Sequence, residues 1–370
     1  MTKADFLFMM LRSELWGEKI EPFEMTQRQY RSLMDMADMQ TVMGHLCASL
    51  MNNKVKLTKY DAIETFSLQK EIANKNDSFD NEVVDLCRLL KSHQIRFFVM
   101  KGQTLAKMYP HPEVRTSGDV DFYCYPEDFQ RAAKVIGEEW KVELDHNNEE
   151  HHYIFSRNGI TYEMHHVLLG LYSSKCRKYF EEQVAQSVLD TIEIKGEEVP
   201  VLDFAFNFVY TFMHMFNHLM QLGVGLRHFI DMLSMCDYWA NMKDGDHKRQ
   251  VAADIASHLD ALGYRKGFEV VGNILVEKLG LPRLSLPVSS NRGFGKKEQD
   301  VLNIVFSRGN FGKYGRQNAV RSGWAYNLEA FFTKLSLQRR VFLLAPKENL
   351  AYVTRGIPGQ IFDSFKRGWK

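Results

Sequence analysis

The spacing of hydrophobic residues along the chain begins with a helical period. In residues 1–93, segments such as "NEVVDLCRLLKSH" place apolar residues three and four positions apart, which predicts helices with one buried face. Asp80 lies just upstream of that segment and is the expected N-cap of its helix. The segment "FLFMMLRSELWG" predicts an earlier helix that ends at Gly17. This first part is therefore expected to be helical.

From residue 94 the pattern changes to short strands. "IRFFVM" (95–100) and "DVDFYCY" (119–125) are rich in β-branched and aromatic residues, as buried strands are. Asn158-Gly159 separates "HHYIFSR" from "ITYEMHHVLL", and this dipeptide predicts a hairpin with a type I′ turn. A second hairpin is expected to turn near Gly196.

The helical period returns at Asp203, the expected N-cap of the long apolar segment "FAFNFVYTFMHMFNHLMQL". We predict an α+β fold in which a small mixed sheet, residues 94–202, forms an α/β core. Helical regions, residues 1–93 and 203–370, flank this core on the N-terminal and C-terminal sides.

Composition adds little to this picture, because 45% of the 370 residues are hydrophobic and the net charge is +1. The charge is unevenly spread, however. Residues 291–370 hold fifteen Lys and Arg against five Asp and Glu. This basic segment either complements the more acidic remainder of the chain or recruits an anionic partner such as RNA.

The five cysteines are widely spaced and never form a CxxC pair, which argues against a disulfide framework and against a zinc site. The sequence shows no signal peptide and no apolar run long enough for a membrane span. We therefore predict a cytoplasmic protein without a membrane partner.

Two aspartates stand inside one of the predicted strands. Residues i and i+2 of a strand point to the same face, so Asp119 and Asp121 present adjacent carboxylates while Val120 and Phe122 face the core. Adjacent carboxylates repel each other unless a cation lies between them, and such oxygen ligands suit Mg²⁺. Glu163 would add a third carboxylate if its strand pairs beside them. Three converging carboxylates are what two-metal phosphoryl or nucleotidyl transfer requires.

A second set of residues is suited to bind phosphate. Gly102 ends the first predicted strand and precedes a short helix, where backbone N–H groups approach a phosphate closely. Lys101 and Arg115 would add charge-assisted contacts to a triphosphate. For both, the alternative is surface solvation or a structural ion pair with an aspartate.

These motifs resemble the nucleotidyltransferases of the DNA polymerase beta superfamily, and more closely the bacterial family of uncharacterised nucleotidyltransferases. The chain shares with that family Lys101-Gly102, Leu105-Ala106, Tyr109-Pro110, Pro112, Arg115, Gly118-Asp119-Val120-Asp121, Glu163, His165, His214, His218, Leu226-Arg227 and Asp231. Gln103 stands where the superfamily has Ser or Gly, and Thr104 is adjacent.

The resemblance implies Mg²⁺ ligation and catalysis by Asp119, Asp121 and Glu163. The residues expected to contact the nucleotide are Lys101, Gly102, Gln103, Thr104, Arg115, Gly118 and Arg227. His165, His214 and His218 are expected to line the site.

Two pairs on the predicted C-terminal helices have competing interpretations. His214 and His218 lie one turn apart, which is compatible with metal ligation, although hydrogen-bonding histidines that line the site are favoured. Arg227 and Asp231 have the same spacing and are expected to pair along the helix. Alternatively, Arg227 reaches the nucleotide phosphates.

Two functions follow from this sequence. The first is a Mg²⁺-dependent enzyme that transfers a nucleoside monophosphate from an NTP to an acceptor hydroxyl and releases pyrophosphate. The acceptor is left open among a sugar, another small molecule, a protein side chain and RNA. The alternative is a non-catalytic nucleotide-binding or partner-binding protein that retains the fold.

Overall fold

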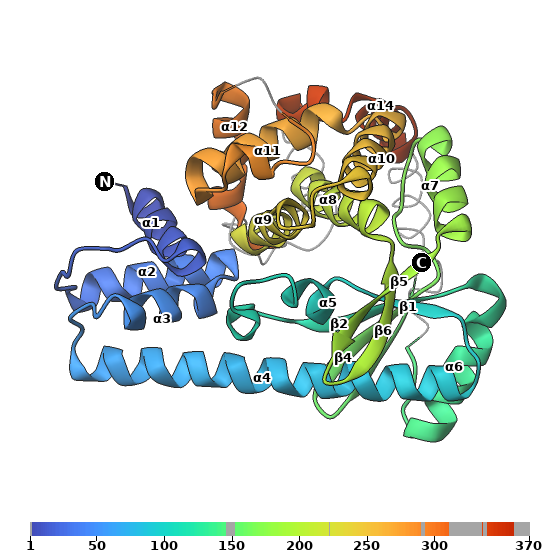
Figure 1. Ribbon diagram of the computed structural model, residues 1–370, viewed down its shortest axis with the longest axis horizontal. Helices are drawn as coiled ribbons and strands as arrows, with labels where there is room; N and C mark the ends of the chain where they lie inside the picture. Colours follow the sequence, from blue (N-terminus) through green and yellow to red (C-terminus); the bar gives the residue numbers. More distant parts are fainter. Residues whose placement is uncertain are drawn as a thin grey trace, which may run out of the picture.

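A computed structural model describes residues 2–145, 152–221, 223–289, 293–310, 335 and 339–358. Within these ranges the chain has an α+β fold, with one four-stranded sheet and one two-stranded sheet. Helices precede and follow the sheets along the chain. Figure 1 shows the N-terminal helices beside the sheet and the C-terminal helices gathered above it. About half of the basic segment 291–370 lies outside the described residues.

Four helices precede the sheet. They are α1 (Lys3–Trp16), α2 (Gln27–Gln40), α3 (Met43–Asn52) and α4 (Lys59–Ser92). The first ends at Gly17 as predicted, because this glycine adopts the left-handed conformation with φ of 68°. Threonine hydroxyls cap three of the four helices, where Thr2, Thr26 and Thr58 each accept a hydrogen bond from a backbone N–H of the first turn.

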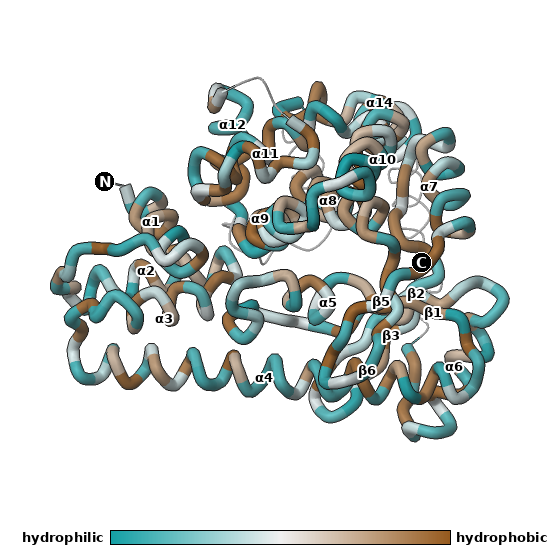
Figure 2. The backbone as a smooth tube through the Cα atoms, viewed as in Figure 1, coloured by the Kyte–Doolittle hydropathy of each residue, from teal (hydrophilic) through white to brown (hydrophobic). Residues whose placement is uncertain are grey.

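The predicted cap at Asp80 is wrong. Helix α4 is continuous from Lys59 to Ser92 and runs along one edge of the molecule (Figure 1), so Asp80 lies in its interior. The Asp80 carboxylate instead accepts hydrogen bonds from the Gln103 amide, at 2.6 Å, and the Lys107 ammonium, at 2.7 Å. The apolar stripe of the second half of α4 was visible in the sequence, whereas its first half is mostly polar (Figure 2).

The four-stranded sheet has the order β1-β2-β4-β3. Its strands are β1 (Phe97–Met100), β2 (Asp119–Cys124), β3 (His152–Arg157) and β4 (Ile160–His165). Strand β2 pairs antiparallel with β1 and parallel with β4, so the sheet is mixed as predicted. Strands β3 and β4 form the predicted hairpin, and both Asn158 and Gly159 have the positive φ that a type I′ turn requires.

Shorter elements connect the strands. They are α5 (Gly102–Ala106), the 3₁₀ helix η1 (Pro112–Val114), α6 (Pro126–Trp140) and α7 (Ser174–Gln186). The second predicted hairpin is formed by β5 (Leu189–Ile194) and β6 (Glu197–Leu202), which turn at Lys195 and Gly196.

The C-terminal helices begin at Asp203, whose carboxylate accepts a hydrogen bond from the Phe206 N–H at 3.0 Å, as an N-cap does. The helices are α8 (Phe204–Gln221), α9 (Leu226–Ala240), α10 (Asp246–Leu262), α11 (Arg265–Leu279), α12 (Lys296–Arg308) and α14 (Pro346–Ala351). Short 3₁₀ or π turns are η2 (Arg283–Ser285), η4 (Phe342–Leu344) and η5 (Tyr352–Gly356). Among the described helices, none combines the length and hydropathy needed to cross a membrane.

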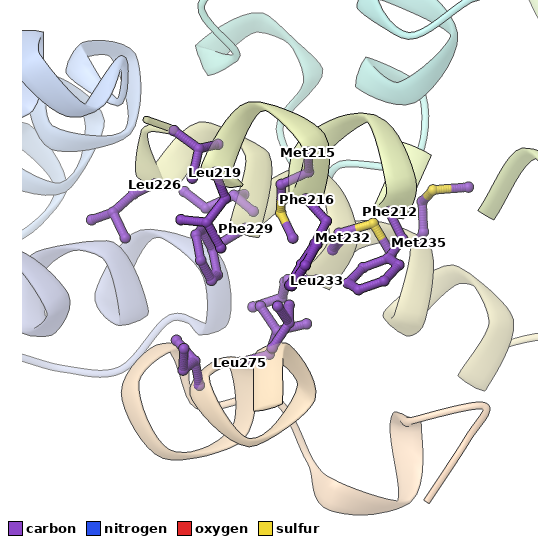
Figure 3. Close-up of a cluster of buried hydrophobic side chains, with 14 of the residues drawn as sticks. Phe212, Met215, Phe216, Leu219, Leu226, Phe229, Met232, Leu233, Met235 and Leu275 are labelled. Atoms are coloured by element: carbon purple, nitrogen blue, oxygen red, sulfur yellow. The ribbon is translucent and has the colours of Figure 1, made fainter. Parts of the chain in front are cut away.

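Two hydrophobic cores cover the two faces of the large sheet. Val120 and Phe122 of β2 face the first core, together with the second half of α4 and helix α6. The alternate residue Tyr123 faces the second core, which contains α8, α9 and the N-terminal helices. Figure 3 shows the centre of this second core, where side chains of α8 and α9, such as Phe216 and Phe229, pack together. The even-numbered residues of β2 are therefore buried as predicted, and Asp119 and Asp121 lie on the other face, toward α8.

All five cysteines are buried and unpaired, which agrees with the prediction that no disulfide framework supports the fold.

Replacing Gly44 by alanine should destabilise the protein. A Cβ atom at Gly44 of α3 would lie 2.1 Å from the backbone oxygen of Val114 in η1, so one of the two elements must move. We expect the free energy of unfolding to fall by about 1–3 kcal/mol, as for other overpacked sites, in urea denaturation. Gly137→Ala is the control, because the nearest atom to its Cβ would be at 3.5 Å and alanine favours the helix. Equal stability of the two variants would contradict this prediction.

Candidate functional site

The three predicted carboxylates come together on one face of the large sheet. Asp119 and Asp121 lie on β2, and Glu163 lies on the neighbouring strand β4. Asp121 and Glu163 are paired residues in the parallel register of these strands, so their side chains stand side by side. The hairpin at Asn158-Gly159 pairs β4 with β3 on its other edge, so β4 lies between β3 and β2 in the sheet.

Asp121 is buried and has two cationic or hydrogen-bonding partners. Its Oδ1 atom lies 2.9 Å from the Lys101 Nζ and 2.9 Å from the His165 Nε2. Burial acts to raise the pKa of Asp121, but the nearby Lys101 charge and the His165 hydrogen bond outweigh it and lower the pKa. Asp121 is therefore ionised at neutral pH.

The other two carboxylates have different environments. Burial and the adjacent Asp121 charge raise the pKa of Asp119 to about 6. The His165 Nε2 lies 3.3 Å from the Glu163 Oε2, and this hydrogen bond is the main cause of the lowered pKa of Glu163. The three carboxylates are thus close together, and Asp119 is the one whose ionised form is least stable.

The carboxylates line a cavity of about 160 Å³ between the sheet and helices α8 and α9. Its lining includes most of the residues that the sequence predicted for the site. These are Lys101, Gly102, Arg115, Gly118, Asp119, Asp121, Glu163, His214, His218 and Arg227. Thr211, His228 and Asp231 of the C-terminal helices complete its polar lining.

The turn after β1 carries Lys101 and Gly102 to the cavity. Lys101 has φ of 53° and ψ of −139°, a conformation that residues with a Cβ atom rarely adopt. Gly102 also has positive φ, and a Cβ atom there would lie 3.5 Å from the backbone oxygen of Asp119. Strained backbone of this kind is typical of functional sites, where the surrounding structure holds it in place.

The side chains of Gln103 and Thr104 do not reach the cavity. The Gln103 amide donates to Asp80 and accepts, at 2.7 Å, from the Ser117 hydroxyl. The Thr104 hydroxyl donates to the Lys101 carbonyl at 2.7 Å. Both side chains therefore hold the turn in place, and the nucleotide contacts expected of these two residues stay a prediction.

Arg115 forms a buried ion pair with Asp231 of α9. Its Nε donates to the Asp231 Oδ1 at 2.8 Å, and its Nη2 donates to the Oδ2 at 3.1 Å. The Tyr109 hydroxyl donates to the same carboxylate at 2.6 Å. Asp231 therefore pairs with a residue of the α/β core, and the expected pairing with Arg227 along the helix is wrong.

Arg227 is left with unused hydrogen-bonding capacity. Its Nη1 donates to the Thr116 carbonyl at 2.9 Å, and its buried Nε has no hydrogen-bond partner among the described residues. Burial, and then the nearby Arg115 charge, lower the pKa of Arg227, although a guanidinium remains charged at neutral pH. A cationic group in this position can bind an anion that enters the cavity.

The histidines of α8 lie against Lys101. The Lys101 Nζ is 3.3 Å from the His214 Nε2, which is 3.2 Å from the His218 Nε2. Burial is the main cause that lowers the pKa of both rings, to about 4 for His218. They are therefore neutral at pH 7, line the cavity and contact each other through their Nε2 atoms.

Comparison with known proteins identifies the family of the chain. A family model described as "Uncharacterised nucleotidyltransferase" matches residues 26–260, which is more than half of the chain. The chain belongs to this nucleotidyltransferase family. The matched residues include all the carboxylates, Lys101, Arg227 and the histidines described above.

Other comparisons are less informative. One solved structure that the chain resembles is an antigenic nucleotidyltransferase-like protein from Paracoccidioides brasiliensis. The two share 14% sequence identity over 50% of this chain and 93% of that chain, with a TM-score of 0.33. No curated protein matches the chain.

The side chains around Asp121 fit a divalent metal ion. Among the described residues, Asp121, Glu163 and His165 each offer one ligand atom, and these atoms lie within 4.8 Å of one another. The two carboxylates suit an ion such as Mg²⁺ or Mn²⁺, whereas an imidazole nitrogen is a more usual ligand of zinc or iron. Sequence reasoning placed His165 only in the lining, although its i+2 spacing from Glu163 was the signal that its imidazole lies beside the same carboxylates.

Proposed function

We propose that this protein transfers a nucleoside monophosphate from a nucleoside triphosphate to an acceptor hydroxyl and releases pyrophosphate, with Mg²⁺ as cofactor. The observation that carries the proposal is the pairing of Asp121 with Glu163 across adjacent strands, beside Asp119, in a cavity that also contains Lys101 and Arg227. Family membership supports a nucleotide as substrate.

In the proposed reaction the acceptor oxygen forms a bond to the α-phosphorus. The bond from that phosphorus to the oxygen bridging the β-phosphate breaks, pyrophosphate leaves, and the acceptor proton passes to a base or to solvent. Asp119, Asp121 and Glu163 would hold Mg²⁺, which when bound supplies positive charge for the phosphate oxygens. Electrostatic stabilisation and positioning account for most of the catalysis in reactions of this type.

The nucleotide contacts proposed from the structure are fewer than those proposed from the sequence. Gly102 and Gly118 lack side chains and allow phosphates to approach the backbone beside the carboxylates. Arg227 also lines the cavity, and its guanidinium charge would attract a phosphate. Gln103, Thr104 and Arg115 would support the site from behind.

Incubation of the protein with each α-³²P-labelled NTP, Mg²⁺ and fractions of a cell extract tests the function. We expect label to appear in an acceptor fraction with one or more of the four nucleotides, and to disappear when EDTA removes the metal. Protein boiled before incubation is the control for enzymes in the extract. If the protein binds nucleotide yet labels nothing in any fraction, the result contradicts transfer and favours the non-catalytic alternative.

A further inference from the structure

A second cavity lies beyond the carboxylates, at the end of the large sheet. Its volume is about 430 Å³, and it shares no lining residue with the cavity of about 160 Å³ that contains the candidate site. Tyr123 of β2 and Tyr125, just after this strand, line the cavity together with residues of α7. A cavity of this size is large enough for a small organic molecule.

The inner surface of this cavity is aromatic and apolar. The Tyr123 ring stacks on Phe98, with ring centroids 4.9 Å apart, and meets the Tyr125 ring edge-on at 5.4 Å. The apolar lining residues, each less than 10% exposed, are Leu168, Leu169, Phe180 and Val184. Such a surface favours a ligand with an aromatic or branched apolar body, because burial removes that body from water and the tyrosine rings can pack on it.

One polar group in this inner surface lacks a partner. Tyr125 is 4% exposed, and its hydroxyl has no hydrogen-bond partner among the described residues. The Arg96 guanidinium lies over the face of the Tyr125 ring, with its carbon 4.1 Å from the ring centroid. A buried hydroxyl without a partner is unfavourable, so a polar atom on the ring of a ligand would be stabilised there.

The charged side chains that line the cavity sum to zero when histidine is counted as neutral. They are two arginines and two glutamates. Arg96 and Glu127 form a salt bridge with each other at 3.0 Å. Arg177 and Glu181 lie one turn apart on α7, and neither forms a salt bridge within the part of the chain that the structure describes. One positive and one negative group are therefore available to a ligand that carries both charges.

We propose that this cavity binds a zwitterionic small molecule with a polar aromatic ring, of which the amino acid tyrosine is the simplest example. The carboxylate of the ligand faces Arg177, and its ammonium group faces Glu181. The ring of the ligand lies against the tyrosines of the sheet, and its hydroxyl bonds to Tyr125. This site is separate from the carboxylates and does not depend on the proposed function.

Equilibrium dialysis of the full-length protein against ¹⁴C-labelled L-tyrosine or L-phenylalanine tests the proposal. We expect saturable binding that is at least about fivefold tighter for tyrosine, because only its ring can bond to the Tyr125 hydroxyl. Arg177→Gln should weaken the binding of both amino acids about tenfold, since it removes a charge-assisted hydrogen bond. Lys178→Gln is the matched control, because Lys178 is on the same helix but outside the lining, and its affinity should stay within about twofold of the wild type.

Three further variants locate the bound amino acid. Tyr125→Phe should bind tyrosine and phenylalanine equally. Ala185→Trp, which adds a large ring at an exposed lining position, should abolish binding, whereas Gln186→Trp, the next position and outside the lining, should bind normally. Asp121→Asn should also bind normally, because the two cavities share no residue.

Circular dichroism verifies that each variant is folded. The proposal would be overturned by a wild type without saturable binding, by unchanged binding in folded Ala185→Trp or Arg177→Gln, or by a preference for tyrosine that survives in Tyr125→Phe. Loss of binding in folded Asp121→Asn would place the amino acid at the carboxylates and overturn it as well. None of these measurements requires nucleotide transfer, so failure of the proposed function would leave their outcome unaffected.

Discussion

Asp121→Asn should lower the rate of nucleotide transfer by at least about 10³-fold. Asparagine keeps the shape of the side chain but loses the charge that a metal ion requires. Such a loss removes several kcal/mol of transition-state stabilisation, and each 1.4 kcal/mol is worth a factor of ten in rate. The substitution also leaves the Lys101 ammonium without its carboxylate partner, so Lys101 would repel a metal ion. Initial rates of label transfer with and without Mg²⁺ measure the effect.

Asp85→Asn is the matched control for this variant. It makes the same chemical change in helix α4, where Asp85 is 45% exposed and pairs with Arg157 outside the cavity. We expect its transfer rate to stay within about twofold of the wild type, because an exposed ion pair contributes little to structure. A folded Asp121→Asn protein with the rate of Asp85→Asn would refute the assigned role of Asp121.

Asp231→Asn should destabilise the whole protein. The Asp231 carboxylate accepts three hydrogen bonds, two from Arg115 and one from Tyr109, and both Arg115 and Asp231 are less than 6% exposed. Removing one partner of a buried ion pair leaves an uncompensated charge and costs about 3–5 kcal/mol. This pair joins the α/β core to helix α9, so we also expect the cavity between them to lose its shape. Urea denaturation at pH 7 measures the change in free energy.

The stability that Asp231→Asn loses relative to the wild type should depend on pH. Burial acts to raise the pKa of Asp231, but Arg115 outweighs it and lowers the pKa from 3.8 to about 2. A lowered folded-state pKa contributes stability above the unfolded pKa, and this contribution disappears as the pH falls through the folded value. The shift corresponds to about 2 kcal/mol at neutral pH. The stability difference between wild type and Asp231→Asn should therefore shrink between pH 4 and pH 2.

Asp246→Asn provides the comparison. Asp246 is fully exposed and pairs with Arg249 at the surface, so its substitution should leave the unfolding midpoint unchanged at every pH. If Asp231→Asn is no less stable than Asp246→Asn at pH 7, the buried pair does not hold the α/β core and α9 together.

Much of the sheet could be predicted because its signals are local. The alternation of residues in 119–124 determines which side chains share a face, and Asn158-Gly159 specifies a tight turn through its own backbone preferences. Residues 1–93 were expected to be helical, but local spacing did not show that a single helix runs from Lys59 through Asp80 to Ser92. In its first half, Tyr60, Ile63 and Phe66 are spaced three residues apart yet are exposed, so this apolar spacing does not mark a face buried in a core.

The partners of the charged side chains were harder to predict than their positions. Arg227 and Asp231 have the spacing of a helical ion pair, yet Asp231 binds Arg115, which lies 116 residues away in the chain. Local spacing shows only which pairs are within reach. Asp231 is buried where α9 packs against the α/β core, and a buried carboxylate needs a compensating positive charge. Arg115 supplies that charge.

The sequence by itself determined that three carboxylates, a glycine turn and a set of histidines belong to one site, because strand alternation and family motifs are properties of neighbouring residues. Only the tertiary structure decided that Lys101 contacts Asp121 instead of facing outward, and that His165 reaches the same oxygen from the other side. Those contacts depend on the order β1-β2-β4, which places side chains from three separate segments around a single carboxylate. Strand order follows from how the sheet packs between its two cores, and no short stretch of sequence encodes it.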